Sequence, residues 1–286
     1  MRHLPRLFPG SLAVCAAVAV LFLAAPAGAA VSHAAANPAA GRQNAAARHA
    51  RAVARAGIRR LAARWLRSFA VQRPPSGPAA STIPGKVTSS SWGGYADISE
   101  TFNQVAGKWT QPALTCGSST TVATTWVGLD GYSDNTIEQA GTLAECVGGT
   151  AYYYAWWQIY PSGGLQLEGI PVAPGDLITG SVNHPTKNAY TLAVTDSTQQ
   201  DSFTANGSCS GCADSSAEWI AGAEAGSTTI IPAFTWSPFA ATVTAGVGQG
   251  VINSYPCMQI IPVNGSTSAL NDEDNGFTVV WKRTTP

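Results

Sequence analysis

Short runs in which apolar and polar residues alternate fill the chain from about residue 87 onward. Gly, Pro, Asn and Asp separate these runs, which is typical of strands joined by turns. The runs predict strands at 105–110, 120–129, 151–160, 189–195, 218–223, 241–244 and 277–282. No stretch of this part has a helical period. About 200 residues of this kind predict one all-β domain, an antiparallel sandwich or barrel with a large core.

Before residue 87 the pattern is different. Residues 45–70 are rich in Ala, Arg and Leu, and large apolar residues recur there at helical spacing: Ile58, Leu61, Trp65 and Phe69. This predicts a basic amphipathic helix, and the four prolines between 74 and 84 predict a linker after it. A processed pro-segment fits this leader best. A disordered exported tail and a nucleic-acid-binding tail are the alternatives, and nothing else in the chain favours nucleic acid as a partner.

At the N-terminus, basic residues precede an apolar run at 12–25 that ends in the small residues Ala27-Gly28-Ala29. This order predicts a cleavable signal peptide, because the uncharged run is too short to span a bilayer comfortably. We therefore expect a secreted, extracellular protein with no membrane anchor after signal cleavage. Its expected parts are a signal peptide at 1–29, a basic pro-segment and Pro-rich linker at 30–86, and the β domain at 87–286.

The overall balance of 16 basic and 16 acidic residues hides two parts of opposite charge. The first acidic residue is Asp97, and only four basic residues follow it, so this part has a formal charge of −12. The leader that remains after signal cleavage has ten basic residues and no acidic one. Such asymmetry favours a leader that docks on its own acidic domain. The pro-segment is therefore an expected partner of the β domain.

The β domain has five cysteines: Cys116, Cys146, Cys209, Cys212 and Cys257. Export favours disulfides over zinc or redox chemistry. Cys209 and Cys212 can close a tight loop and Cys116 can pair with Cys146, which leaves Cys257 over, although the spacing does not fix the pairing. Zinc normally takes histidines or four close thiols, and this domain has neither. No metal and no other cofactor is expected.

Residue types exclude most hydrolytic mechanisms. His184 is the only histidine after His49, and beside Pro185 it fits a surface turn better than a Ser-His-Asp or Cys-His site. The motifs Asp-Thr-Gly and Asp-Ser-Gly of paired-aspartate proteases do not occur, and neither does a Gly-rich phosphate loop. Carboxylates, amides and tryptophans remain. They favour attack by a water molecule that a carboxylate and a polar donor assist.

Four stretches of the domain form an ordered set: Ser90-Ser91-Trp92-Gly93-Gly94, Trp126 to Gly131 running on to Glu138-Gln139-Ala140-Gly141, Tyr153 to Pro161, and Ala217-Glu218-Trp219-Ile220. In this order and spacing the chain, over about 87–282, resembles the eqolisin family of glutamic peptidases. These are secreted, acid-acting, pepstatin-insensitive endopeptidases made with a pro-segment. The resemblance implies a sandwich of two large antiparallel sheets of the concanavalin-like jelly-roll type. It also implies a protein or peptide substrate and a monomer.

The family's mechanism, carried over by resemblance, pairs a glutamate base with a glutamine whose amide donates to the oxyanion. The family's glutamine matches Gln139, and Glu138 is expected on the opposite face of the same strand. Further positions of the cleft, by resemblance, are Trp92, Trp126, Asp130 and Trp156. Gln158 is grouped with them, because it stands where the family has a second acidic residue.

The family's base position falls on Gly222, which has no group that could take a proton. Substitutes on the same strand face are Glu224, two residues on, and Glu218, four residues back and about 13 Å away along an ideal strand. Glu224 is the nearer substitute base. Two functions follow from these residues. One is an acid endopeptidase that uses Gln139 and a displaced glutamate, and the other is a silent relative that binds peptide or polysaccharide in an aromatic cleft.

Overall fold

The computed structural model describes residues 85–89, 91–98, 100–117, 121–132, 134–223, 242–245, 248–250, 252–263, 265–272 and 275–281. The predicted signal peptide, helix and linker lie outside the described residues, and so does Glu224. Within the described ranges every regular element is a strand, apart from a 3₁₀ turn at Ile252–Ser254. The predicted all-β class is thus confirmed.

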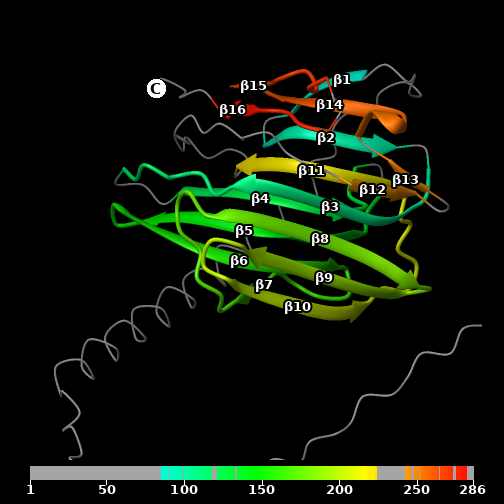
Figure 1. The fold of residues 1–286 in the computed structure, drawn as a ribbon, viewed down its shortest axis with the longest axis horizontal. Coiled ribbons are helices and arrows are strands. Elements are labelled where there is room, and N and C mark those ends of the chain that lie inside the picture. The colour runs from blue at the N-terminus through cyan, green and yellow to red at the C-terminus, as the bar shows by residue number, and fades with distance from the viewer. Residues whose placement is uncertain are drawn as a thin grey trace, which may run out of the picture. The chain divides into compact units, whose positions relative to one another are not determined.

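The strands form two large sheets and one small pair (Figure 1). The eight-stranded sheet has, in order, β1 (Gly85–Ser89), β14 (Cys257–Pro262), β2 (Trp92–Ile98), β11 (Ser216–Ala223), β4 (Thr121–Leu129), β5 (Ile137–Val147), β6 (Thr150–Tyr160) and β7 (Gln166–Glu168). The six-stranded sheet has β10 (Asp201–Ser208), β9 (Ala189–Asp196), β8 (Leu177–Thr186), β3 (Phe102–Thr110), β12 (Thr242–Ala245) and β13 (Gly248–Gly250). Strands β15 (Gly265–Thr267) and β16 (Val279–Trp281) pair with each other. All of these pairs are antiparallel except β1 with β14.

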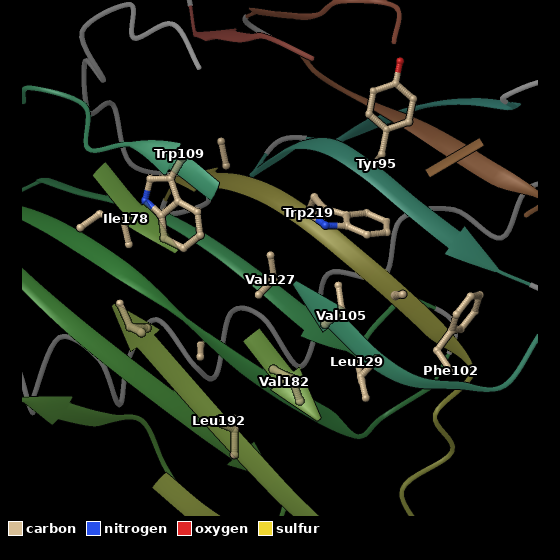
Figure 2. Close-up of a cluster of buried hydrophobic side chains, with 14 of the residues drawn as sticks. Tyr95, Phe102, Val105, Trp109, Val127, Leu129, Ile178, Val182, Leu192 and Trp219 are labelled. Carbon is tan, nitrogen blue, oxygen red and sulfur yellow. The ribbon is translucent and has the colours of Figure 1, made fainter. Parts of the chain in front are cut away.

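The main hydrophobic core lies between the two large sheets. The eight-stranded sheet contributes Tyr95, Val127 and Trp219, and the six-stranded sheet contributes Trp109 and Val182 (Figure 2). All of these side chains are at most 1% exposed. Aromatic and branched side chains on the inner faces of both sheets thus form the packed layer of a β-sandwich.

A second apolar cluster lies on the other face of the eight-stranded sheet, which we call the outer face. Successive residues of a strand point to opposite faces. Val127 therefore belongs to the core between the sheets, whereas its neighbour Trp126 belongs to the outer cluster with Trp92, Trp156 and Ile220. Strand β5 is buried on both faces over most of its length. This two-sided burial removes the alternation that would have predicted β5 from its sequence.

The predicted surface turn at His184 and Pro185 is wrong, since both residues belong to β8. The pairing of β8 with β9 shifts in register between Asn183 and Thr186, which accommodates a proline that cannot donate to the ladder. His184 is partly buried, and its ring stacks on Tyr190 with centroids 4.5 Å apart. Its Nδ1 atom lies 2.8 Å from a carboxylate oxygen of Asp214.

Candidate functional site

Gln139 lies on the outer face of β5, directly opposite Gln158 of β6. Its Nε2 donates to Oε1 of Gln158 at 2.9 Å, and both side chains are 1% exposed. The amide nitrogen of Gln158 is buried without a hydrogen-bond partner. An amide nitrogen carries two hydrogens, so Gln139 keeps a second hydrogen for another acceptor. The two sequence-predicted glutamines therefore form one buried amide pair.

The three predicted tryptophans also come together on the outer face. The ring centroids of Trp92 and Trp126 are 5.8 Å apart in an edge-to-face arrangement, and those of Trp126 and Trp156 are 6.3 Å apart. Each ring is at most 3% exposed. Aromatic contacts of this kind stabilise packing beyond the buried area itself. The three side chains are a packed cluster beside the amide pair, with little ring surface in contact with solvent.

Gly222 pairs with Trp92 on β2 and with Thr124 on β4. A Cβ atom built on Gly222 would lie only 2.5 Å from Cζ3 of Trp126 and 2.7 Å from its Cη2. Real Cβ atoms do not approach other atoms so closely, so any side chain at 222 must displace the Trp126 indole. The ring thus occupies the space next to the position where the family resemblance expects a glutamate.

The strand register places a different glutamate in line with Gln139. Glu218 pairs with Gly128, and Gly128 pairs with Gln139, so the three residues share one row across β11, β4 and β5. Gly128 has no side chain to separate the other two. The row is four residues along β11 from Gly222, which is why spacing along that strand alone did not reveal it. Glu224, the predicted substitute base, lies outside the described residues.

Glu218 is almost fully buried and accepts a hydrogen bond of 3.1 Å from the Ser216 hydroxyl. Burial raises the pKa of its carboxyl well above the ordinary value, and the nearby Asp134 and Asp130 carboxyls raise that pKa further. Hydrogen bonds from Ser216 and the Tyr132 backbone oppose the shift. In acid, Glu218 is therefore a neutral carboxylic acid and a poor base.

Asp130 lies apart from the tryptophans, in the loop after β4, where its φ of 62° turns the chain. Its carboxylate accepts hydrogen bonds from three successive backbone N–H groups, those of Ala213, Asp214 and Ser215, at 2.6–2.8 Å. The hydroxyl of Thr136 is a fourth donor, at 2.9 Å. Burial and the neighbouring Asp134 raise the pKa of Asp130 to about 6, against the opposing effect of these donors. Its contacts are those of an anchor for the loop that precedes β11.

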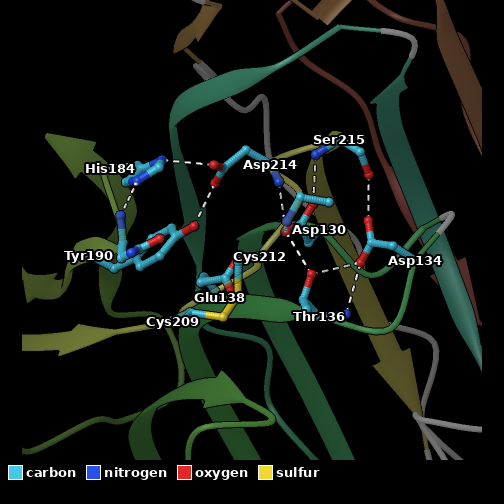
Figure 3. The surroundings of a disulfide bond; sticks show 12 residues. Asp130, Asp134, Thr136, Glu138, His184, Tyr190, Cys209, Cys212, Asp214 and Ser215 are labelled. Carbon is cyan, nitrogen blue, oxygen red and sulfur yellow. Dashed lines mark hydrogen bonds and ion pairs between the residues drawn. A yellow bond between two sulfur atoms is a disulfide. The ribbon is translucent and has the colours of Figure 1, made fainter. Parts of the chain in front are cut away.

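Glu138 points away from Gln139, as its strand position predicts, and lies in an acidic cluster beside a disulfide (Figure 3). The cluster is made by Asp130, Asp134, Glu138 and Asp214, together with His184 and Tyr190. Burial raises the pKa of Glu138 to about 10, and the carboxyls of Asp130, Asp214 and Asp134 add to this shift. The sequence gives no signal for this cluster, because its members come from three strands and two loops.

Carboxyl oxygens of Asp130, Glu138 and Asp214 lie within 4.8 Å of one another, a spacing that a cation could use. The Asp130 oxygens already accept four hydrogen bonds, and Asp214 accepts the Tyr190 hydroxyl and pairs with His184. Protein donors therefore already occupy the carboxylates of Asp130 and Asp214, and we assign no metal to the cluster.

The cysteines pair as the sequence allowed. Cys116 is bonded to Cys146 and Cys209 to Cys212, while Cys257 is a buried thiol outside both disulfides. The first bond joins β5 to the loop after β3, and the second closes the turn after β10. Both confirm that the domain is cross-linked by disulfides.

One buried acid on the outer face was missed by sequence reasoning. Glu145 of β5 is 1% exposed, and neither of its carboxyl oxygens has a hydrogen-bond partner. Burial raises the pKa of Glu145 to about 7. It lies six residues from Gln139 on the same strand, about 20 Å away along an ideal strand, which is too far to share a water molecule.

A small hollow lies elsewhere, lined by the loop 111–114 and by residues of β4 and β5. Its lining includes Thr124, Thr142 and Ala144 but neither glutamine of the amide pair. Within the part of the chain that is described, we find no apolar helix of membrane-spanning length.

Sequence comparison identifies relatives of the domain. The Peptidase A4 family model matches residues 90–274. Aspergillopepsin-2 of Aspergillus niger is 28% identical over 155 residues, which cover 46% of this chain and 55% of that protein. Scytalidopepsin B of Scytalidium lignicola is 36% identical over 94 residues, which cover 32% of this chain and 35% of that protein. The matched stretches thus span about half or less of these relatives' own lengths.

Solved structures share the fold. A scytalido-glutamic peptidase with a transition state analog inhibitor superposes with a TM-score of 0.54 at 23% identity, over 67% of this chain and 98% of that one. A member of the eqolisin family in complex with the tripeptide Ala-Ile-His gives 0.50 at 22% identity, over 68% and 98% of the two chains. Because the family model covers more than half of the sequence and the sandwich matches these structures, the protein belongs to the peptidase A4 family, the eqolisin glutamic peptidases.

Proposed function

We propose that this protein is a secreted endopeptidase of the glutamic type that hydrolyses protein or peptide substrates in acid. Gln139 supplies the amide that binds the oxyanion of the tetrahedral intermediate. The observation that carries the proposal is the state of this amide, since Gln139 is held by Gln158 yet keeps one hydrogen uncommitted. The neighbour of Gln139 on β4 is Gly128, which has no side chain that could cover the amide.

The base of the proposed reaction is Glu224, the first glutamate after the empty position at Gly222. Glu218 lies in the row of Gln139, but its raised pKa keeps it protonated in acid, and a protonated carboxyl cannot take the proton of an attacking water. In this proposal the substrate lies against the outer face of the eight-stranded sheet, where Trp92, Trp126 and Trp156 pack beside Gln158. Asp130 acts indirectly, by anchoring the loop that precedes β11.

A second function is favoured by a specific observation. By resemblance, the family's base position falls on Gly222, which has no side chain. The Trp126 ring occupies the space in which a side chain at this position would lie. A protein of this kind would bind peptide or polysaccharide on its aromatic face without cleaving it.

One assay separates the two functions. The purified mature domain is incubated with a denatured protein between pH 2 and pH 7, with pepstatin present to suppress contaminating aspartic proteases. The peptidase proposal expects acid proteolysis that Glu224→Gln abolishes and that Gln139→Ala lowers by about 100-fold to 1000-fold. If the unmodified chain binds peptide or polysaccharide in calorimetry but releases no new amino termini at any pH, the second function replaces the first.

The remaining parts of the chain follow from the same proposal. The signal peptide directs export, the basic leader covers the acidic domain until it is removed, and the mature domain works as an extracellular monomer. Leader and domain carry opposite charge, which is the support for their pairing.

A further inference from the structure

The disulfide between Cys209 and Cys212 lies in the turn that follows β10. Cys209 is buried, at 2% exposure, whereas Cys212 is partly exposed. Thiol–disulfide exchange begins with attack of a thiolate on one sulfur, so access decides which sulfur is attacked. A reagent from solvent reaches the sulfur of Cys212 first, and Cys209 becomes the leaving group.

A buried carboxyl lies against this disulfide. Oε1 of Glu138 is 2.5 Å from the sulfur of Cys212, and its Oε2 has no hydrogen-bond partner. A carboxyl oxygen of Glu138 and both sulfurs lie within 4.8 Å of one another. Because a disulfide sulfur carries no hydrogen, a hydrogen bond between the two groups must use a proton of Glu138.

The surroundings keep that proton on Glu138. The groups that face it are the carboxyls of Asp130, Asp134 and Asp214 and the hydroxyl of Tyr190. His184 also faces the cluster, with its Nδ1 atom 2.8 Å from a carboxylate oxygen of Asp214. Glu138 is itself 0% exposed, and burial among acidic neighbours favours its neutral form. Glu138 is therefore a proton donor held next to a bond whose cleavage produces thiolates.

We propose that Cys209–Cys212 is an exchange-active disulfide, reduced by an external dithiol that attacks Cys212, with Glu138 as the proton donor to the leaving thiolate. In the first step the S–S bond to Cys209 breaks, a new S–S bond joins Cys212 to the dithiol, and the Cys209 thiolate takes the proton of Glu138. In the second step the other thiol of the dithiol gives its proton to solvent and attacks the dithiol sulfur that is bonded to Cys212. The mixed S–S bond breaks, the dithiol becomes a cyclic disulfide, and Cys212 leaves as a thiolate that takes a proton from solvent. Two electrons pass from the dithiol to the protein, and solvent returns the proton to Glu138.

The other disulfide is a matched control within the same molecule. Cys116–Cys146 also joins a partly exposed sulfur to a buried one. Its nearest acid in sequence is Glu145, which follows Ala144 on β5 and points to the opposite face of the strand from Cys146. It therefore has similar access from solvent without a carboxyl placed at the sulfur.

The experiment follows both disulfides in the folded full chain. The chain is treated with dithiothreitol for increasing times, thiols are blocked with iodoacetamide, and peptides are mapped by mass spectrometry. We expect Cys209 and Cys212 to be alkylated well before Cys116 and Cys146. Glu138→Gln keeps the shape of the neutral acid but not its acidity, and should slow opening of Cys209–Cys212 by about 100-fold. The rate at Cys116–Cys146 should stay unchanged.

Buried Cys257 reports on folding in the same experiment, since its alkylation would mark an unfolded variant. If Glu138→Gln exposes Cys257, the order of opening in the unmodified chain still decides the proposal. Equal opening rates of the two disulfides would overturn it, and so would a folded Glu138→Gln variant with unaltered selectivity.

Discussion

The Trp126 indole packs over the backbone of Gly222, and this single contact decides what position 222 can carry. The contact joins β11 to β4 on the outer face, where Trp126 also meets Trp92 and Trp156. Only glycine leaves room for the ring in its present position. Glycine at 222 and the packing of the tryptophan cluster are thus parts of one structural arrangement.

We expect Gly222→Ala to lower the free energy of unfolding by about 1–3 kcal/mol, because the added methyl group overpacks a filled site. Gly222→Ala should cost less stability in a chain that already carries Trp126→Leu, because the smaller leucine leaves room for the added methyl group. Urea unfolding monitored by circular dichroism measures both effects. The control is Gly117→Ala, where an added Cβ meets nothing within 4 Å, and which should change stability by less than about 0.5 kcal/mol. Equal effects at 222 and 117 would contradict the packing argument.

The turn between β10 and β11 has no regular secondary structure, but hydrogen bonds to a buried carboxylate fix its backbone. Its residues Ala213, Asp214 and Ser215 all donate to Asp130, and Asp214 in turn accepts the hydroxyl of Tyr190. Hydrogen bonds to a charged acceptor are stronger than neutral ones. Asp130 therefore fixes the entry of β11, and with it the position of Glu218 in the row of Gln139.

Asp130→Ala should destabilise the domain by about 2–4 kcal/mol, because three backbone N–H groups lose their acceptor, that of Asp214 in a buried place. Thermal unfolding at pH 7 followed by calorimetry gives the loss. Asp201→Ala is the matched comparison, since Asp201 is exposed on β10 and accepts one N–H, that of Ser202. Its effect should be well under 1 kcal/mol. A smaller loss at Asp130 than at Asp201 would remove the anchor role.

At the scale of the whole molecule, several buried carboxyls of the described residues have a raised pKa. Burial raises the pKa of Asp97 and Glu218 well above the ordinary range, that of Glu145 to about 7 and that of Asp130 to about 6. In the unfolded chain these groups titrate near pH 4. Between pH 4 and the folded pKa the native state binds more protons than the unfolded state, so stability falls as pH rises through this window. The domain is thus expected to be more stable in acid than near neutral pH.

The unfolding midpoint in urea should accordingly be higher at pH 4 than at pH 7.5. Glu145→Gln should raise stability at pH 7.5 by about 1–3 kcal/mol and leave it unchanged at pH 4, because the glutamine cannot become charged. Glu100→Gln, at an exposed position, serves as the control with no effect expected at either pH. A midpoint that is flat or rises between pH 4 and pH 7.5 would be incompatible with these shifts.

The sequence by itself determined the all-β class, the expectation of disulfides, the opposite faces of Glu138 and Gln139, and the family. These follow from local rules, namely the two-residue period of strands, the redox chemistry of export and the order of short motifs. Which cysteines pair was decided by the structure. Strand β5 was not predicted, because both of its faces are buried and its sequence therefore lacks the alternation of apolar and polar residues. The predicted turn at His184 failed because tertiary pairing with β9 kept Pro185 within a strand.

Only the tertiary structure decided which residues share a site. Strand register put Glu218 rather than Gly222 in the row of Gln139. A shift of β11 by two residues would have put an uncharged residue of the same face, such as Ile220, in that row. Side-chain packing put the Trp126 ring over Gly222 and the Glu138 carboxyl against Cys212. Register and packing depend on contacts between residues far apart in sequence. Neither can be read from the spacing of residues along one strand.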